Sequence, residues 1–430
     1  MHKVGKCKKL FYLSPMKTAI PFFSFWLVAT VVSAQSQPAQ PTSGPGGSDY
    51  THALTQMNEY GSAEEQFWIF EPVDPKPDSA DVIAFIHGLA DVNPQVYGGW
   101  INHLVRKGNI VIFPRYQMGD IGESDTAFSS FAGLAIKAAF DTLTHPNHVI
   151  PRLNHFAIAG HSYGGLMTAN MGIINDDFGF PAPKCLFVAE AYNDAANTVR
   201  IPNYNIMPAD MKMQIVVGQN DAIVGNTFGR FLMDSTINVN TSHKNYIKLK
   251  PDNHGSPAIA ADHSDPMSKL DAFDSGVTNA LIIGSLFTLE TDAADYFCFW
   301  KLFDALLSCT FYNQDCEYAF GDTPQQKNMG SWSDGTPLTP LEVEPASTSV
   351  SEQELAVVKL FPNPAIEKVY FSGQPTHISI TDITGRTLYS GNAIADGIAV
   401  DRWPSGLYLY KLEMQNGERA TGKLWVKAGN

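Results

Sequence analysis

Between residues 48 and 342, short apolar runs alternate with longer stretches of helical periodicity. Seven runs have the length and composition of buried strands: 66–70, 82–86, 109–113, 155–159, 185–189, 213–217 and 246–250. Residues 125–143, in contrast, repeat their apolar side chains with the period of a helix. Strands that alternate with helices pair in parallel through crossover connections, so the pattern predicts an α/β fold with a doubly wound, mostly parallel sheet.

The composition changes after residue 342, where a polar stretch predicts a linker over residues 343–356. The segment 357–430 has short strand-like runs, frequent turn residues and no helical period. Within it, apolar and polar residues alternate on both sides of Thr384-Gly385, which is typical of a hairpin. The sequence therefore predicts a second, small all-β sandwich domain.

The N-terminus reads as a targeting segment. Five lysines lie among its first seventeen residues, and the apolar run 19–34 ends in the small residues Val32-Ser33-Ala34. A membrane anchor needs about 20 apolar residues, and this run is shorter. We therefore expect residues 1–34 to be a cleaved signal peptide, followed by a Pro/Gly/Ser/Gln linker over residues 35–47. No later segment is apolar enough to span a bilayer, so the mature protein should lack a transmembrane helix.

Charge and cysteine content restrict the possible partners. The formal net charge of -14 disfavours binding to nucleic acid, because both surfaces would be negative. Four cysteines remain after removal of the signal peptide, and their spacing does not match a zinc site, so we expect no metal. Cys309 and Cys316 are close enough to close a short disulfide loop, and export would permit one. Cys185 lies in an apolar run, where a buried free thiol is equally compatible.

The segment AIAGHSYGGL, residues 157–166, places Ser162 between glycines, just after the strand-like run 155–159 and just before a helical stretch. This strand–turn–helix setting is what the G-x-S-x-G motif requires to form a nucleophile elbow. Gly160 and Gly164 suit a strained turn at which neighbouring elements approach closely. We therefore predict that Ser162 is a nucleophile rather than a residue of a structural turn.

A serine hydroxyl needs a base, and after a nucleophile elbow the acid and then the histidine follow along the chain. Asp221 comes just after the run 213–217, and His254 comes just after the run 246–250. Parallel strands end at one edge of a sheet, so the three side chains should meet there. We expect His254 to take the Ser162 proton and Asp221 to orient His254.

Two rival residues stay open as alternatives. His263 is the other candidate base, but it lies further from a strand end than His254. Glu190 directly follows the run 185–189 and is the other candidate acid, one strand earlier than Asp221. For the oxyanion hole, the strand-like run 82–86 leads into His87-Gly88, which points to the backbone N–H groups of Leu89 and Tyr163 as donors.

With these motifs, residues 48–342 resemble a secreted α/β-hydrolase of the dienelactone-hydrolase-like, platelet-activating-factor-acetylhydrolase-like and cutinase-like branches. The resemblance implies a serine carboxylester hydrolase that works through an acyl-enzyme, needs no cofactor and acts on small or polymeric esters. GHSYGGLMT also resembles the nucleophile region of prolyl-oligopeptidase-like peptidases, although no propeller-sized segment precedes the domain. A peptidase and a catalytically silent binding protein are therefore the alternatives.

The C-terminal segment resembles the type A sorting domain of the type IX secretion system found in Bacteroidetes. The residues that carry the resemblance are LFPNPAIEKVYF, ISITDITGRTLYSG and WPSGLYLYKLEMQNGERATGKLWVK. It implies that the type IX machinery is a partner and that the protein is secreted or attached to the cell surface. The alternative is a carbohydrate-binding β-sandwich, but no row of aromatic residues supports it.

Overall fold

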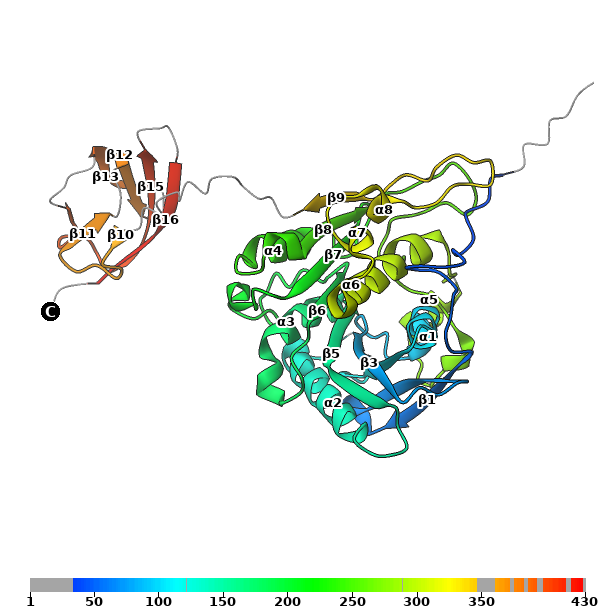
Figure 1. Ribbon diagram of the computed structural model, residues 1–430. Coiled ribbons are helices and arrows are strands. Elements are labelled where there is room, and N and C mark those ends of the chain that lie inside the picture. The colour runs from blue at the N-terminus through cyan, green and yellow to red at the C-terminus, as the bar shows by residue number, and fades with distance from the viewer. Residues whose placement is uncertain are drawn as a thin grey trace, which may run out of the picture. The chain divides into compact units, whose positions relative to one another are not determined.

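The computed structural model describes residues 34–120, 122–287, 289–345, 360–371, 375–382, 386–392, 397–414 and 419–427. They form two compact units that divide at residues 346–347 (Figure 1). The expected signal peptide lies outside the described residues except for Ala34. The expected linker over residues 343–356 lies outside them beyond residue 345.

The first unit is built on one nine-stranded sheet. Its strands are β1 (Leu54–Tyr60), β2 (Phe67–Val73), β3 (Ser79–Ile86), β4 (Asn109–Pro114), β5 (Ile150–His161), β6 (Cys185–Ala189), β7 (Lys212–Gly218), β8 (Lys244–Leu249) and β9 (Glu342–Pro345). All seven apolar runs of the sequence lie in strands β2 to β8, apart from a residue at the ends of two of them. β2 to β4 and β6 to β8 are buried along almost their whole length, which is why apolar residues predominate in most of them, although β8 (KNYIKL) also contains three polar residues.

The strands are arranged in the order β1-β2-β4-β3-β5-β6-β7-β8-β9. Six neighbouring strands, from β4 through β3, β5, β6 and β7 to β8, run parallel. β1 and β2 at one edge and β9 at the other pair antiparallel with their neighbours. Because the central strands are parallel, the segments that follow β5, β6, β7 and β8 all leave from the same edge of the sheet.

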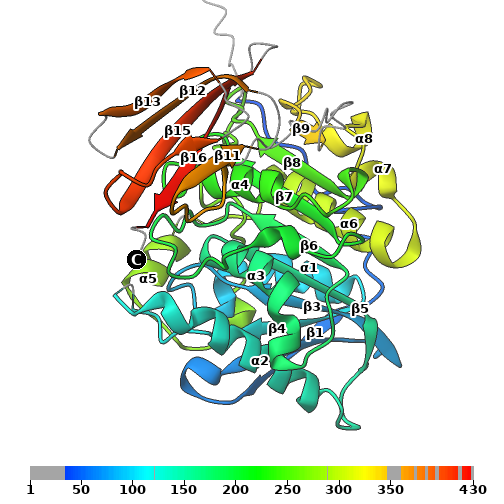
Figure 2. The same cartoon turned by 90° about the vertical axis from the view of Figure 1, so that its left-hand side faces the viewer.

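Helices cover both faces of this sheet. They are α1 (Gly98–Arg106), α2 (Phe128–Thr142), α3 (Tyr163–Phe178), α4 (Thr227–Ser235), α5 (Ala280–Leu286), α6 (Lys301–Tyr312), α7 (Cys316–Ala319) and α8 (Pro324–Lys327), with a π-helical turn (Asp295–Trp300) leading into α6. In Figure 2, α2, α3 and α4 face the viewer, in front of the sheet, with α1 and α6 behind it. No helix in the described ranges is both long enough and apolar enough to cross a bilayer.

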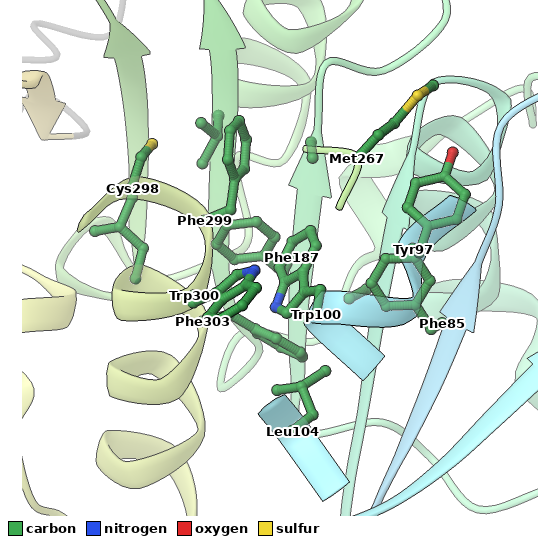
Figure 3. Close-up of a cluster of buried hydrophobic side chains, with 14 of the residues drawn as sticks. Phe85, Tyr97, Trp100, Leu104, Phe187, Met267, Cys298, Phe299, Trp300 and Phe303 are labelled. Atoms are coloured by element: carbon green, nitrogen blue, oxygen red, sulfur yellow. The ribbon is translucent and has the colours of Figure 1, made fainter. Parts of the chain in front are cut away.

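Aromatic side chains join α1 and α6 to the sheet (Figure 3). Trp100 of α1 lies with its ring 5.9 Å from Phe299 and 6.1 Å from Phe303, and Phe303 lies 5.2 Å from Phe187 of β6. These residues share one large buried cluster on this face of the sheet. These aromatic contacts pack α6 and the turn before it against the sheet.

Residues 35–47, which were expected to be a linker, lie against the rest of the first unit. The Gly46 N–H donates to Asp304 Oδ2 at 2.8 Å, and the Ser36 N–H donates to Ser333 Oγ at 3.0 Å. Gln37 Oε1 accepts from the Ala293 N–H at 2.8 Å. Hydrogen bonds made by the backbone of this segment and by Gln37, rather than apolar packing, hold it against the first unit. Its polar composition therefore gave no indication of the contact.

The disulfide between Cys309 and Cys316 is present, as predicted, and joins the end of α6 to the start of α7. Cys185 and Cys298 are buried free thiols. Burial raises the pKa of the Cys185 thiol to about 12, so this group is an inert part of the core.

The second unit consists of two small antiparallel sheets around one core. Their orders are β10-β11-β14 and β13-β12-β15-β16, and their bounds are β10 (Leu360–Phe361), β11 (Lys368–Phe371), β12 (Pro375–Asp382), β13 (Thr387–Asn392), β14 (Ile398–Ala399), β15 (Gly406–Met414) and β16 (Arg419–Val426). Val369 and Ile398 of the smaller sheet share a buried cluster with Ile380 of the larger one. β12 and β13 pair antiparallel as the predicted hairpin requires, and its turn residues 384–385 lie outside the described residues.

Candidate active site

Ser162 lies in a sharp turn between β5 and α3. Its φ of 56° and ψ of -121° are rare for a residue with a side chain. The Ser162 N–H donates to Ala189 O of β6 at 3.1 Å, and the Ser162 carbonyl accepts from the Tyr192 N–H at 2.9 Å. These hydrogen bonds offset the strain and direct the side chain out of the carboxyl edge of the sheet.

The two glycines of the motif are required by close backbone contacts. A Cβ at Gly164 would lie 1.9 Å from Ile86 O, at the end of β3. A Cβ at Gly160 would lie 2.3 Å from Gly164 O. Both approaches are far shorter than van der Waals contact, so only glycine lets β5 and α3 pack this tightly around Ser162.

His263 joins Ser162 to Asp221. The Nε2 atom of His263 lies 3.0 Å from Ser162 Oγ, and its Nδ1 atom lies 2.9 Å from Asp221 Oδ2. Asp221 follows β7, and its Oδ1 accepts from the N–H groups of Ile223 and Val224 at 2.9 and 3.0 Å. These contacts hold a hydroxyl, an imidazole and a carboxylate in line for proton transfer.

The prediction that His254 is the base is wrong. His254 Nε2 contacts Asp334 Oδ2 at 2.8 Å, and its half-exposed ring lies 5.9 Å from that of Trp332. After β8 the chain makes a small excursion, closed by an antiparallel bridge between Asp252 and Ile259. His254 lies within that excursion, away from Ser162.

The returning chain is fixed to the loop after β7, where the Asn220 N–H donates to Ala261 O at 2.8 Å and the Asn220 side chain donates to Ala260 O at 2.9 Å. These contacts bring the rival His263 over Asp221. The number of residues between the strand end and the histidine was the wrong criterion, because the Asp252–Ile259 bridge brings the chain back to the end of β8. The small residues Ala260 and Ala261, whose carbonyl groups accept the hydrogen bonds from Asn220, were the available signal.

The electrostatic environment keeps Asp221 ionised. Burial alone would raise its pKa, but the hydrogen bonds from His263 and from the backbone N–H groups of Val224 and Ile223 outweigh burial and lower it below the ordinary value. Asp221 can therefore stabilise a positive charge on His263. Glu190, the rival acid, also lies close to His263: its Oε2 is 3.6 Å from His263 Nδ1.

Leu89 and Tyr163, the expected oxyanion donors, line the same pocket as Ser162. Tyr163 is the first residue of α3, where a backbone N–H has no acceptor within the helix. Leu89 follows Gly88, whose N–H donates to the Tyr97 hydroxyl at 3.0 Å. His87 braces this loop, because its buried ring stacks on that of Tyr116 at 4.2 Å and its Nδ1 lies 2.6 Å from Gly88 O.

A pocket of about 630 Å³ opens beside Ser162 and His263. Its wall is largely apolar and aromatic: Leu89, Tyr163, Tyr192, Ile223, Val224, Met267 and Leu281. The rings of Tyr163 and Tyr192 stack at 3.9 Å, while Ile223 and Leu281 are exposed at the rim. A pocket of this size and polarity suits a small, mostly apolar ligand.

Three potential metal-ligand atoms lie close together in the described part of the chain, on His161, Glu190 and His263, all within 4.8 Å of one another. His263 already uses both ring nitrogens, one toward Asp221 and one toward Ser162. An ion at Nδ1 would break the contact with Asp221. We therefore do not identify these residues as metal ligands.

An acidic group beside the site should make stability depend on pH. Burial, reinforced by Asp262 and Asp292, raises the pKa of Asp265 from 3.8 to about 8. The folded chain thus holds this proton more tightly than the unfolded chain, and the free energy of unfolding should fall as the pH rises from about 4 to about 8. Asp265→Asn removes the ionisable carboxyl group and therefore this pH dependence. Its amide oxygen can still accept the hydrogen bond from the Asp262 N–H.

Thermal unfolding of the wild type and of Asp265→Asn across this pH range tests the assignment. The stability of the variant relative to the wild type should increase between pH 4 and pH 8 and then level off. An equal difference at both ends of the range would contradict a raised pKa at Asp265.

A comparison with protein families identifies the second unit. Residues 359–427 match the family described as a secretion system C-terminal sorting domain, which confirms the sorting domain expected for residues 357–430. The chain thus carries the signal that the type IX machinery recognises. The protein is secreted or located at the cell surface of a Bacteroidetes-like bacterium. No curated protein matches the chain.

Proposed function

We propose that the first unit is a serine carboxylester hydrolase in which Ser162 attacks the ester, His263 transfers the proton and Asp221 orients His263. The observation that carries this proposal is the pair of hydrogen bonds made by His263, 3.0 Å to Ser162 and 2.9 Å to Asp221. A serine turn without a catalytic role would not need a buried carboxylate aligned behind an imidazole.

The same proposal assigns an α/β-hydrolase fold to this unit. In support, two antiparallel strands precede six parallel ones, and β4 lies outside β3 in the sheet. Ser162, Asp221 and His263 follow β5, β7 and β8, which is the Ser–acid–His order that this fold uses. The strained backbone of Ser162 has the character of a nucleophile elbow.

In the acylation step, Ser162 Oγ bonds to the ester carbonyl carbon and gives its proton to His263 Nε2. The carbonyl oxygen becomes an oxyanion that accepts hydrogen bonds from the N–H groups of Leu89 and Tyr163. The intermediate then collapses, and the bond to the alcohol oxygen breaks. That oxygen takes the proton from His263, which leaves an acyl group on Ser162.

In the deacylation step, a water molecule attacks the acyl carbon and gives a proton to His263 Nε2. The bond to Ser162 Oγ breaks, Oγ takes the proton back, and the carboxylic acid leaves. In both steps the ionised Asp221 stabilises the positive imidazole at its Nδ1–H. The chemistry uses only groups of this chain and one water.

The pocket favours esters with an apolar acyl or aromatic group. Its apolar wall would bury such a group next to Ser162, while Ile223 and Leu281 at the rim leave room for the remainder of a larger substrate. Each buried methylene contributes about 0.8 kcal/mol, so affinity should rise with acyl length until the pocket is full.

The test uses the full mature chain with p-nitrophenyl esters of graded acyl length, beside proline-containing peptides and a fluorophosphonate probe. We expect ester hydrolysis and covalent labelling at Ser162. Ser162→Ala should lose both, while Ser130→Ala, which changes an exposed serine of α2 away from the pocket, should keep both. Cleavage of the peptides without the esters would replace the proposal by a peptidase, and a failure to label Ser162 would support a silent binding protein.

A further inference from the structure

Glu190 is a buried carboxyl group that the proposed mechanism does not use. It follows β6 with a φ of 44°, a strained value for a residue with a side chain, and its N–H donates to Val216 O of β7 at 2.8 Å. Its side chain is fully buried, and neither carboxyl oxygen has a hydrogen-bond partner among the described residues. Burial of a carboxyl group without a hydrogen bond lowers the free energy of unfolding, which indicates that Glu190 has a functional role.

The Glu190 carboxyl lies beside the imidazole of His263. Its Oε2 is 3.6 Å from His263 Nδ1 and 3.7 Å from His161 Nε2. Asp221 approaches the same His263 nitrogen at 2.9 Å. Two carboxyl groups from successive strand ends, β6 and β7, therefore face one ring nitrogen, and Glu190 Oε2 lies about 0.4 Å beyond the usual limit of about 3.2 Å for a hydrogen bond.

The backbone leaves space for this second carboxyl. A Cβ at Gly218, the last residue of β7, would lie 2.8 Å from Glu190 Oε1 and 2.6 Å from Ala261 O. A side chain at residue 218 would therefore push Glu190 away, or displace the loop that carries His263. Glycine here allows both to stay in place.

The surroundings shift the pKa values of the two carboxyl groups in opposite directions. Burial raises the pKa of Glu190 well above its usual value, and the nearby Asp265, Asp221 and Asp262 raise it further. His161 provides no compensating charge, because burial lowers its own pKa well below the usual value and keeps it neutral. The surroundings thus favour the ionised form of Asp221 and the protonated form of Glu190.

We propose that Glu190 is a positioning residue and a second acid for His263, which assumes the role of Asp221 when that carboxylate is absent. This inference rests on the proposed hydrolase function. Without Asp221, one of the charges that keep Glu190 protonated is gone, and Nδ1 of His263 has lost its partner. A small shift then lets the ionised Glu190 accept the hydrogen bond from Nδ1 and stabilise the positive imidazole.

Several titratable groups act on Glu190 and must be considered in any pH profile. They come from the ends of β5, β7 and β8 and from the π-helical turn before α6: His161, Asp221, Asp262, His263, Asp265 and Cys298. The three aspartates repel a negative charge on Glu190, and the Cys298 thiol is neutral. Glu190 should therefore ionise only when the pH is raised.

The experiment compares Asp221→Ala, Glu190→Gln and the double variant in the full mature chain. Loss of a triad acid with no substitute costs about 10⁴-fold in kcat. We expect Asp221→Ala to lose only about 10- to 100-fold, and the double variant to lose the full 10⁴-fold or so. Glu190→Gln alone keeps the shape and neutrality of the resting side chain, so it should lose less than about tenfold at neutral pH.

The pH profile separates positioning from a purely structural role. The kcat of Asp221→Ala should keep rising with pH as Glu190 ionises, and this rise should be absent from the double variant. Asp221→Ala/Asp334→Asn is the matched control, because the Asp334 carboxyl contacts His254 and not His263. It should behave like Asp221→Ala.

Unfolding midpoints and the rate of fluorophosphonate labelling at Ser162 are measured for every variant. Equal residual activities and equal pH profiles for Asp221→Ala and the double variant, both folded, would overturn the role of Glu190 and leave the hydrolase intact. A wild type that neither hydrolyses esters nor labels at Ser162 would overturn the proposed function, and this inference with it.

Discussion

Replacing His263 by alanine should reduce kcat for ester hydrolysis by about 10⁴-fold or more. Ser162 would lose the base that lies 3.0 Å from its hydroxyl, and the leaving alcohol would lose its proton donor. The residual rate would come from the oxyanion donors and from substrate binding. Because the imidazole acts on the transition state, KM should change much less than kcat. Steady-state kinetics with p-nitrophenyl esters measure both.

His254→Ala is the matched control for this prediction. Its side chain contacts Asp334 and Trp332 in the excursion after β8, so its loss should change the free energy of unfolding by about 0.5 kcal/mol or less and leave kcat nearly unchanged. The opposite ranking, with His254→Ala inactive and His263→Ala active, would restore the assignment made from sequence and would rule out the geometry described for His263.

Replacing Gly164 by alanine should destabilise the first unit by about 3 kcal/mol or more and abolish esterase activity. The added Cβ would lie 1.9 Å from Ile86 O and 2.6 Å from His87 O. Both are backbone atoms, so no side-chain rotation can relieve the clash. β3 and the loop that carries Leu89 would have to move away from Ser162, which would separate the two oxyanion donors. Chemical denaturation and ester turnover measure the two effects.

Gly284→Ala serves as the control for an added methyl group. Gly284 lies within α5, is exposed, and has no atom within 4 Å of the position that a Cβ would occupy. Alanine there should be neutral or should stabilise the protein by up to about 1 kcal/mol, because glycine is a poor helix former. If Gly164→Ala is as stable and active as Gly284→Ala, the close packing around Ser162 is wrong.

The strands that the sequence missed are those at the edges of the sheet. β1 (Leu54–Tyr60) has no fully buried residue and mixes polar and apolar residues, and β9 (Glu342–Pro345) has four residues. β9 also extends the first unit to residue 345, three residues beyond the expected boundary at 342. Buried central strands leave a continuous apolar run, whereas an edge strand is defined by hydrogen bonds to its neighbour, which leave little mark on composition.

The acids at the site show a second limit of reasoning from sequence. Asp221 and Glu190 both follow predicted strands, and the sequence offered them as alternatives. In the structure both approach His263, at 2.9 and 3.6 Å. Whether a buried carboxyl is ionised depends on its surroundings in three dimensions, and residues as distant along the chain as Asp265 contribute to the state of Glu190.

The turn around Ser162 could be read from ten consecutive residues, because a strand, two close-packing glycines and a helix start are local features of the chain. The same holds for the seven buried strands and for the short Cys309–Cys316 loop. The identity of the base could not be read in this way. Two histidines follow β8, and the choice between them depends on the Asp252–Ile259 bridge and on the hydrogen bonds that fix Ala260 and Ala261 to Asn220, which lies about 40 residues earlier in the sequence.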